Sequence, residues 1–582
     1  MTRTIQRREP VADTLDTPRD WPQQLSPLMR RVYAARGAQT YALAQPRLNQ
    51  LLPPDALLGI DAAAQLLADA MDAGRHILVV GDFDCDGATA CAVAVRGLRM
   101  LGAQHVSYAV PNRMVHGYGL SPALVDDLVG MRPELLVTVD HGIACHAGIA
   151  AARAYGWQVL VTDHHLPGEH LPAADVIVNP NLRDDTFPSK SLAGVGVIFY
   201  VLLALRRHLR DAGRFSGASG GDLPDLSVLL DLVAVGTVAD LVPLDTNNRT
   251  LVAAGLRRLR AGHGCVGLRA LIEVSRKQAA TLTTSDIGFS MAPRINAAGR
   301  LEDMALGIEC LLCDEPHRAR ELAEVLDGIN AERRGVQQQM VGDAEAAIAS
   351  LSFDSHTGRA TVCLYREDWH PGVVGLVASK IKERVHRPAI AFAPSDVGSD
   401  QLRGSARSIP GFHIRDALAA VDTQYPGLIV KFGGHAMAAG LSLRLTDLPR
   451  FQAAFEHCVA AMLSPDMLQD VILSDGAMAP EVCDINTALA LRDGGPWGQG
   501  FAEPLFDDVF EVLSWKIIGE QHLKLELAWP GARTKRFNAI HFGGWTGDAP
   551  APRSRIAYRL QPDDWRGGDA VQLVVVHREA AL

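Results

Sequence analysis

Short apolar runs alternate with amphipathic segments through the first half of the chain. The runs are only three to five residues long and rich in Val, Leu and Ile, which is typical of strands buried on both faces of a sheet. The segments between them repeat apolar residues at helical spacing. The expected strands are residues 77–80, 106–110, 135–139, 158–162 and 176–178. Strands that alternate with helices predict an α/β fold, with a parallel sheet covered by helices on both faces.

A longer helical stretch interrupts this alternation. Residues 309–350 are rich in Ala, Glu, Gln and Arg, a composition typical of a solvated connecting helix. Strands and helices alternate again from about residue 359, and after about residue 465 short strands follow one another between turns. This last pattern predicts a small β-barrel of the OB type. Its expected strands are residues 509–513, 515–518, 523–527, 537–542, 556–560 and 571–576.

These changes of pattern predict several parts of the chain, as expected for 582 residues, which are too many for one hydrophobic core. The expected parts are an N-terminal arm (1–48), a parallel-sheet domain (49–260), a connecting region with a long helix (261–350), a smaller α/β domain (351–462) and an OB-like domain (463–582).

Composition and charge narrow the class of protein. The nine cysteines are an odd number and are scattered, which favours reduced thiols over a disulfide framework. The formal net charge of −10 argues against a protein that coats nucleic acid over its whole surface, but it is compatible with a local basic groove that binds nucleic acid with the help of metal ions. Apolar runs stay shorter than a membrane span, and the polar N-terminus does not resemble a signal segment. We therefore expect a cytoplasmic protein with no membrane association.

Acidic and imidazole side chains follow the expected strands where they end. Gly81-Asp-Phe-Asp-Cys-Asp-Gly87 places three carboxylates at alternate positions, and we expect Gly87 to close the turn before a helix that starts at residue 88. Asp140-His141, Asp163-His-His165 and Asn179-Pro-Asn181 follow three of the other four strands, those that end at residues 139, 162 and 178. The carboxyl ends of parallel strands lie along one edge of the sheet, and clustered acids repel one another unless a cation neutralises them. The sequence therefore predicts a shared metal site at this edge.

Two simpler interpretations of the acidic stretch are a solvated turn and a calcium loop, although the Glu that a calcium loop needs is missing at the required distance.

A further carboxylate supports the metal site. Asp240 lies near the end of an almost wholly apolar helix expected over residues 227–241, where an unpaired carboxylate costs several kcal/mol. Asp240 should therefore meet a cation, and Asp231 in the same helix is a weaker candidate.

Several motifs, in order, resemble those of the DHH phosphoesterases. They are Gly81-Asp-Phe-Asp-Cys-Asp-Gly-Ala-Thr89, Thr138-Val-Asp-His-Gly142, Asp163-His-His165 and Gly236-Thr-Val-Ala-Asp240. Downstream segments are similar to the RecJ branch of that superfamily, which has a second, DHHA1-type domain: Pro293-Arg-Ile-Asn-Ala-Ala-Gly-Arg-Leu301, Gly404-Ser-Ala-Arg-Ser408 and Phe432-Gly-Gly-His-Ala436. The chain departs from the usual pattern at Cys85, where Ala is common, and at His116, where an acid is expected.

This resemblance implies a single-strand-specific 5′→3′ exodeoxyribonuclease that hydrolyses phosphodiesters to 5′-mononucleotides by a two-metal mechanism, with two divalent cations, Mn²⁺ or Mg²⁺. It also implies work in DNA recombination, recombinational repair and mismatch repair. The implied partners are single-stranded DNA, single-strand-binding protein and a RecQ-type helicase. A monomer is expected, since the sequence has no heptad repeat that would indicate an oligomer.

The resemblance also assigns residues to roles. The residues that match direct metal ligands are Asp84, Asp86, Asp140, His164 and Asp240, with Asp140 bridging. Residues expected to orient these ligands or act in catalysis are Asp82, Asp163, His165 and His141, together with His435, which would hold the scissile phosphate or simply cap a turn. Residues expected to grip a 5′-phosphate are Arg113, Ser405 and Arg407. Residues expected to contact the backbone or bases of the next nucleotides are Arg294, Asn296 and Arg300. Tyr118 would stack on a base or fill a turn. Each arginine could instead form an ordinary ion pair.

Two other functions stay open at this point. One is a phosphodiesterase or pyrophosphatase of the same superfamily that acts on small molecules or short oligonucleotides, although such enzymes are typically shorter and lack the β tail. The other is a binding scaffold with an inactive metal site, whose hallmark would be the loss of the acids that this chain retains.

Overall fold

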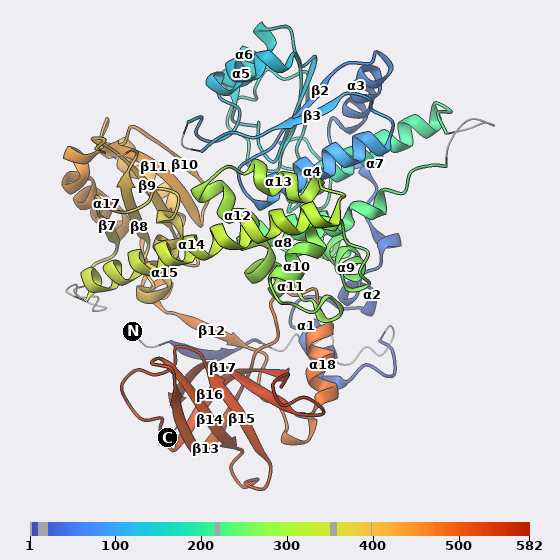
Figure 1. Ribbon diagram of the computed structural model, residues 1–582. Coiled ribbons are helices and arrows are strands. Elements are labelled where there is room, and N and C mark those ends of the chain that lie inside the picture. The colour runs from blue at the N-terminus through green and yellow to red at the C-terminus, as the bar shows by residue number, and fades with distance from the viewer. Residues whose placement is uncertain are drawn as a thin grey trace. The chain divides into compact units, whose positions relative to one another are not determined.

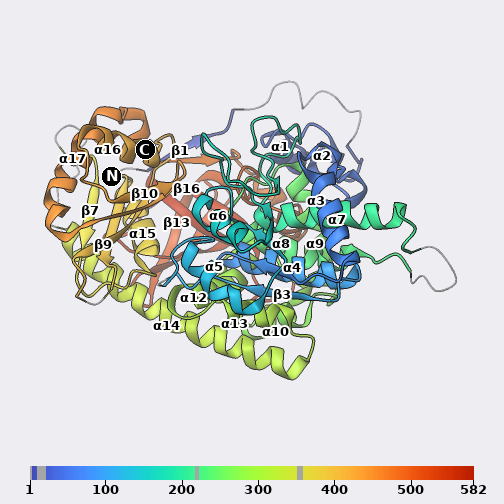
Figure 2. The ribbon, with the colours of Figure 1, turned by 90° about the horizontal axis from the view of Figure 1, so that it is seen from above.

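The computed structural model describes residues 3–9, 21–113, 115–215, 222–349, 358–396 and 398–581 (Figure 1). The chain divides into two compact units. The first consists of Arg8–Asn330 with Asp475–Leu582, and the second of Met1–Arg7 with Ala331–Ser474. Helix α14 (Pro316–Ile348) begins in the first unit and ends in the second, and can be followed as one continuous ribbon (Figure 2). The predicted boundary between residues 350 and 351 lies outside the described residues.

The first unit contains the predicted parallel sheet. Its strands are β2 (Ile77–Val80), β3 (Val106–Ala109), β4 (Leu135–Val139), β5 (Gln158–Thr162) and β6 (Val176–Val178). They lie in the order β3-β2-β4-β5-β6, and every neighbouring pair is parallel. The chain leaves β2 toward β3 on one side and then returns to β4 on the other. This reversal is a topological switch point, where open α/β sheets form a ligand crevice at the carboxyl ends of the strands.

Helices cover both faces of this sheet because successive side chains of a strand point to opposite sides. Leu78 and Val80 pack in one apolar cluster with residues of α5 (Pro122–Leu128) and α6 (His146–Ala154). Ile77 and Val79 belong to a second, larger cluster. The helices that supply this cluster are α3 (Ile60–Asp72), α4 (Cys85–Met100) and α7 (Gly194–Asp211). The predicted α/β architecture is thus confirmed.

Further helices of the first unit follow the sheet. They are α8 (Leu230–Ala239), α9 (Thr246–Arg260), α10 (Val266–Val274), α11 (Thr284–Asp286), the π-helical turn η7 (Ile287–Met291), α12 (Ala292–Leu301) and α13 (Ala305–Leu312). The helix predicted over residues 227–241 is a 3-10 turn followed by α8. The stretch predicted as one helix from residue 309 is broken before Pro316, because proline starts a helix readily but cannot continue one.

The C-terminal part of the first unit is a closed five-stranded barrel in the order β13-β14-β15-β17-β16. Its strands are β13 (Phe506–Ile518), β14 (His522–Ala528), β15 (Arg536–His541), β16 (Arg553–Pro562) and β17 (Val571–Ala580). The two strands predicted over residues 509–518 are one strand, with a bulge between Val512 and Ser514. A bulge inserts an extra residue that bends the strand without ending it, which is why the sequence pattern was interpreted as two strands. The predicted OB-like barrel is confirmed.

The described part of the first unit also contains the short α-helices α1 (Pro27–Ala34) and α2 (Tyr41–Ala44), which precede the sheet, and α18 (Ile485–Asp493), which precedes the barrel. Among the described residues, no single helix is both long and apolar enough to cross a membrane. Residues 48–56 and 60–72 would reach that length only as a pair, and they are bent by 86°.

The second unit holds a mixed sheet in the order β10-β11-β9-β8-β7. Its strands are β7 (Val362–Tyr365), β8 (Ala389–Pro394), β9 (Gln401–Arg407), β10 (Lys431–Gly434) and β11 (Ala438–Arg444). Its helices are α15 (Val374–Val385), α16 (Ile414–Gln424) and α17 (Leu448–Met462). A parallel pair of β1 (Thr4–Arg7) with β12 (Val471–Ser474) also belongs to this unit. The sequence did not predict this pair.

Candidate metal and active site

The structure brings carboxylates and imidazoles from distant parts of the first unit together at the carboxyl ends of β2, β4 and β5. Three overlapping groups have ligand atoms within 4.8 Å of one another. The groups are Asp82 with Asp84 and Asp140, Asp86 with His164 and Asp240, and Asp140 with His164 and His165. The cluster lies beside the switch point between β2 and β4, because residues 82–86, which we call the acidic loop, follow β2 and Asp140 follows β4.

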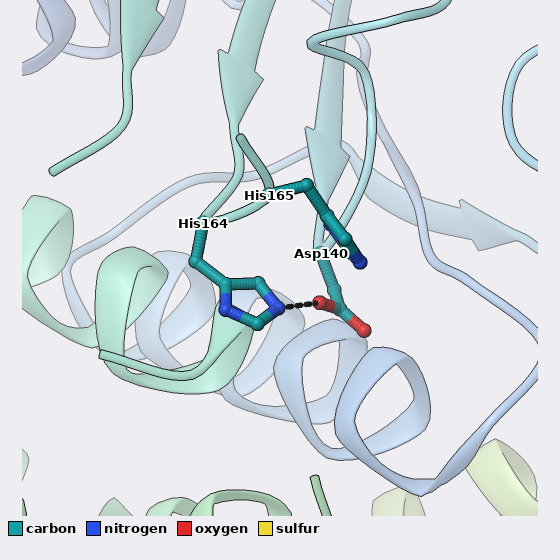
Figure 3. Close-up of side chains that lie close together, drawn as sticks. All are labelled: Asp140, His164 and His165. Atoms are coloured by element: carbon teal, nitrogen blue, oxygen red, sulfur yellow. Dashed lines mark ion pairs between the residues drawn. The ribbon is translucent and has the colours of Figure 1, made fainter. Parts of the chain in front are cut away.

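His164 faces the acids of the cluster. Its Nε2 lies 3.1 Å from Asp140 Oδ1 and 3.5 Å from Asp240 Oδ2, and Figure 3 shows the ring pointing at the Asp140 carboxylate. Asp240 follows the last residue of α8, so the apolar helix presents its terminal carboxylate to the cluster. Asp231, in contrast, is buried and accepts hydrogen bonds from the amides of Leu232 and Cys265, which is a structural role.

The acidic loop is shaped by the first turns of two helices. Asp84 caps α4 by accepting a hydrogen bond from the Gly87 amide (3.0 Å). The predicted turn at Gly87 is therefore wrong: the cap starts the helix at Cys85. Asp86 accepts hydrogen bonds from the amides of Gly194 (2.7 Å) and Val195 (3.0 Å), the first residues of α7. Helix N-termini carry positive partial charge, so both helices favour the charged carboxylates.

Two glycines allow the close approach of these elements. A Cβ atom on Gly194 would lie 2.4 Å from the Cβ of Asp140, and one on Gly236 would lie 2.8 Å from Asp86 Oδ1. Neither distance is compatible with a real side chain. Gly194 therefore matters to the site, and it lies outside the motifs that the sequence singled out. No predicted strand, helix or motif includes it, so nothing in the sequence marked its importance.

The carboxylates of the cluster repel one another when they are charged. Burial, with the charge of Asp84, raises the pKa of Asp82 to about 8 and that of Asp86 to about 7. Burial and the surrounding acids raise the pKa of Asp140 and Asp240 well above the ordinary range. Charged acids packed in this way need a counter-ion, and carboxylate oxygens with an imidazole are a donor set that suits Mg²⁺ or Mn²⁺. These residues therefore fit a divalent metal site.

His165 forms a separate pair with Asp163. Its Nδ1 lies 2.7 Å from Asp163 Oδ1. Burial, the largest single effect, opposes the charged form of His165, but the hydrogen bond and charge of Asp163, with the charges of Asp240 and Asp82, together raise the pKa of His165 to about 9. Burial alone would raise the pKa of Asp163, yet the hydrogen bond and charge of His165 lower it below its usual range. Asp163 also accepts from the amides of His164 (2.7 Å) and Ile143 (2.8 Å), so it orders the backbone that follows two strands.

Other polar residues at the sheet edge support the backbone. Asn179 Nδ2 donates to the carbonyl of His165 (2.8 Å), and Asn181 Nδ2 donates to that of His164 (2.6 Å). The asparagines after β6 therefore hold the two histidines instead of presenting oxygens to the cluster. His141 lies against the carbonyl of Val80 through Nε2 (3.0 Å), and burial lowers its pKa to about 4, so it is a neutral core histidine.

The predicted substrate residues of the first unit lie in two places. In the loop after β3, the Arg113 guanidinium lies 4.0 Å from the centre of the Phe83 ring, and the Tyr118 hydroxyl lies 3.3 Å from His165 Nε2. The remaining three are on α12. Arg294 Nε donates to Asp327 Oδ1 of α14 (2.9 Å), Asn296 Oδ1 accepts from the amide of Cys85 (2.9 Å), and Arg300 is half-buried.

The predicted residues of the second unit lie on its sheet. Ser405 and Arg407 occupy alternate positions of β9, and Arg407 Nη1 donates to Ser405 Oγ (2.8 Å). The start of α15 approaches this pair closely, since a Cβ on Gly375 would lie 2.7 Å from Arg407 Nη2. His435 is exposed in the turn between β10 and β11, where its amide donates to the carbonyl of Ala438 (2.8 Å).

Comparisons with known proteins agree with this architecture. The model of the DHH family N-terminal domain matches residues 76–237, that of the DHHA1 domain matches residues 358–461, and that of the RecJ OB domain matches residues 474–577. These matches cover the parallel sheet, the mixed sheet and the barrel in turn.

Relatives match nearly the whole chain. A single-stranded-DNA-specific exonuclease RecJ from Escherichia coli is 47% identical over 98% of both chains. The crystal structure of RecJ from Thermus thermophilus in complex with Mn²⁺ has a TM-score of 0.78 at 30% identity, covering 96% of this chain and 76% of that one. The corresponding complex with Mg²⁺ has a TM-score of 0.74 at 28% identity, covering 96% and 75%. The resemblance predicted from the motifs is confirmed, and the chain belongs to the RecJ family of the DHH phosphoesterases.

Proposed function

We propose that this protein degrades single-stranded DNA from its 5′ end and releases 5′-mononucleotides. The observation that carries the proposal is the cluster of five aspartates with His164 at the switch point of the sheet, in a chain whose relatives at 47% identity or above are named single-stranded-DNA-specific exonucleases. All the acids that a metal-dependent phosphodiesterase needs are present and converge. An inactive binding scaffold is therefore the weaker hypothesis.

The proposed metal ligands are Asp84, Asp86, Asp140, His164 and Asp240. Asp82, whose ligand atom lies within 4.8 Å of those of Asp84 and Asp140, would contact a cation or orient these ligands. The relatives of known structure bind Mn²⁺ or Mg²⁺, and we propose two such cations here. When bound, a pair of divalent cations neutralises charge on the phosphate and lowers the pKa of an attacking water. The chain's own contribution is to hold these side chains fixed, through the α4 and α7 amides that orient Asp84 and Asp86.

His165 has a different proposed role. The hydrogen bond and charge of Asp163 favour the protonated form of the His165 ring. Nδ1–H is directed to Asp163, which leaves Nε2–H to donate toward the Tyr118 hydroxyl or a phosphate oxygen. The Asp163 carboxylate thus fixes both the orientation and the charge of His165, so that the ring offers a positive donor beside the metal cluster.

Substrate contacts are proposed from the resemblance. In the second unit, Ser405 and Arg407 form a hydroxyl–guanidinium pair of the kind that binds a terminal phosphate, since Arg presents a planar fork of donors. His435 in that unit, and Arg113 and Tyr118 in the first, keep their predicted roles toward the phosphates and bases. Arg300 keeps its predicted contact with the strand. Arg294 is engaged in an ion pair with Asp327, which is the simpler interpretation allowed for each arginine.

The cellular setting is proposed on the same basis. We propose a monomeric, cytoplasmic enzyme of DNA recombination and repair that meets single-strand-binding protein and a RecQ-type helicase. The domain boundaries are also proposed: an arm (1–48), a DHH domain (49–260), a connecting region (261–350), a DHHA1 domain (351–462) and an OB-like domain (463–582).

One degradation assay tests the activity. Single strands and duplexes labelled at the 5′ or 3′ end are incubated with the wild-type protein and Asp140→Ala in the presence of Mn²⁺. Release of mononucleotides from the 5′ end of single strands, by the wild type alone, is the expected result. Equal release by both proteins would refute the metal mechanism. Faster cleavage of dinucleotides than of long strands would instead favour a phosphodiesterase for short substrates.

A further inference from the structure

Helix α12 touches the acidic loop at two points on either side of Asp84. On one side, the Asn296 Oδ1 atom accepts the hydrogen bond of the Cys85 amide at 2.9 Å. On the other, α12 packs so closely on the loop that a Cβ at Gly299 would lie 2.0 Å from the carbonyl oxygen of Phe83. The backbone that carries Asp84 is therefore held from both sides by one helix.

The Cys85 amide is one of the donors that an α-helix leaves without an intrahelical partner in its first turn. Asp84 satisfies the Gly87 amide in that turn, and Asn296 satisfies the Cys85 amide. Without the Asn296 oxygen, the Cys85 amide would need another acceptor, and carboxylates lie on both sides of it in the chain. Such a bond would draw a carboxylate away from the cluster.

Helix α12 is itself anchored. Arg294 Nε donates to Asp327 on α14 at 2.9 Å, and its Nη1 donates to the Ser290 carbonyl at 2.5 Å. Ile295 and Ala298 are fully buried in the core. The helix therefore offers the loop a fixed surface.

We infer that Asn296 is a positioning residue for the metal site: its bond to the Cys85 amide holds Asp84 and Asp86 in the orientation that a divalent cation requires. This role differs from the nucleotide contact that the family resemblance implied for Asn296. It rests on the proposed function only in requiring that the acidic cluster binds a divalent cation. DNA plays no part in it.

The test is Mn²⁺ binding measured by titration calorimetry in the absence of DNA. Asn296→Ala removes the acceptor, and we expect the dissociation constant for Mn²⁺ to rise roughly 10- to 100-fold, the usual effect of losing a residue that orients metal ligands. Asn296→Asp keeps an acceptor oxygen and should bind Mn²⁺ at least as tightly as the wild type. With saturating Mn²⁺, the KM of Asn296→Ala for DNA should stay within about twofold of the wild-type value, because Asn296 does not touch the strand in this account.

A matched control is Asn247→Ala. Asn247 Oδ1 also accepts from a distant backbone amide, that of Leu52 at 3.2 Å, but it lies on α9 and makes its hydrogen bonds away from the acidic loop. Both alanine variants should lower the free energy of unfolding, whereas only Asn296→Ala should weaken Mn²⁺ binding. If Asn296→Ala does not fold, Asn296→Ser replaces it, because the shorter side chain withdraws the acceptor.

Three results would overturn the inference. One is wild-type Mn²⁺ affinity for the Asn296 variants together with a raised KM for DNA, which would make Asn296 a nucleotide contact. Another is an equal loss of Mn²⁺ affinity in Asn247→Ala, which would make the effect one of general stability. The third is weakened binding in Asn296→Asp. Failure of the exonuclease assay with intact Mn²⁺ binding would instead refute the proposed function and leave this inference standing.

Discussion

Replacing Asp140 by Asn should make the metal-free protein more stable while it abolishes metal binding and activity. Asp140 is 2% exposed, and burial and the surrounding acids raise its pKa well above the ordinary range. Its backbone has a φ of 66°, in the left-handed region that Asn tolerates better than most residues. Asn therefore keeps the shape and the backbone conformation, and removes only the charge.

The magnitude follows from the spacing of the cluster. Ligand atoms of Asp82, Asp84 and Asp140 lie within 4.8 Å of one another. Two full charges at that distance repel by about 3.5 kcal/mol at an effective dielectric constant of about 20. Proton uptake relieves part of this, so we expect Asp140→Asn to raise the free energy of unfolding without metal by about 1–3 kcal/mol, which is roughly 2 °C or more in Tm for a domain of this size.

The assay is thermal unfolding with EDTA and with Mn²⁺, for the wild type and both Asp140→Asn and Asp140→Ala. Mn²⁺ at about a hundred times its Kd should stabilise the wild type by about 2.7 kcal/mol and leave both variants unchanged. In EDTA the Ala variant should be about 1–2 kcal/mol less stable than the Asn variant, since Ala is strained at this φ. A lower Tm for Asp140→Asn than for the wild type in EDTA would show that Asp140 does not add to the repulsion in the cluster, and a Mn²⁺-dependent rise in Tm of that variant would show that its carboxylate is not needed for metal binding.

Three other predictions test separate parts of the structure. Gly194→Ala places a Cβ 2.4 Å from the Cβ of Asp140, so we expect it to lower the free energy of unfolding by about 1–3 kcal/mol and to remove most of the activity. Denaturant unfolding and nucleotide release measure the two effects, and wild-type values for both would contradict the close packing of Gly194 on Asp140. Arg407→Ala should reduce the preference for 5′-phosphorylated over 5′-hydroxyl strands roughly tenfold or more, because a charge-assisted hydrogen bond is lost, and an unchanged ratio would remove Arg407 from the phosphate site. Arg36→Ala leaves the buried Asp475 carboxylate without its closest cation (2.8 Å), so we expect a loss of about 3–5 kcal/mol in the free energy of unfolding, whereas a loss below about 1 kcal/mol would show that water or Arg8 replaces the guanidinium.

The sequence predicted the parts of the site that depend on local order along the chain. The apolar run before Asp82 and the one before Asp140 predicted buried strands, and parallel strands necessarily share the edge at which they end. The terminal position of Asp240 on an apolar helix predicted that it meets a cation. These predictions needed only strand direction and the energetic cost of a buried charge.

Contacts between distant segments could not be predicted in the same way. Asn296 and the Cys85 amide are 211 residues apart, and nothing in α12 marks the Asn296 side chain as a partner for a helix start. Gly194 reads as an ordinary small residue until the Asp140 side chain is placed beside it. The pairing of β1 with β12 likewise joins segments that are far apart in the chain. The Thr-Ile-Gln-Arg segment of β1 is too polar to predict a strand, and the apolar run of β12 does not indicate its partner.

Metal binding by the acidic cluster can be tested with a Mn²⁺ anomalous difference map from crystals of the wild-type protein grown with Mn²⁺ and without DNA. If the cluster binds the cations, anomalous density should lie in contact with the carboxylates of Asp84, Asp140 and Asp240 and with His164 Nε2. Manganese bound elsewhere, with no density at this cluster, would contradict metal binding by the cluster.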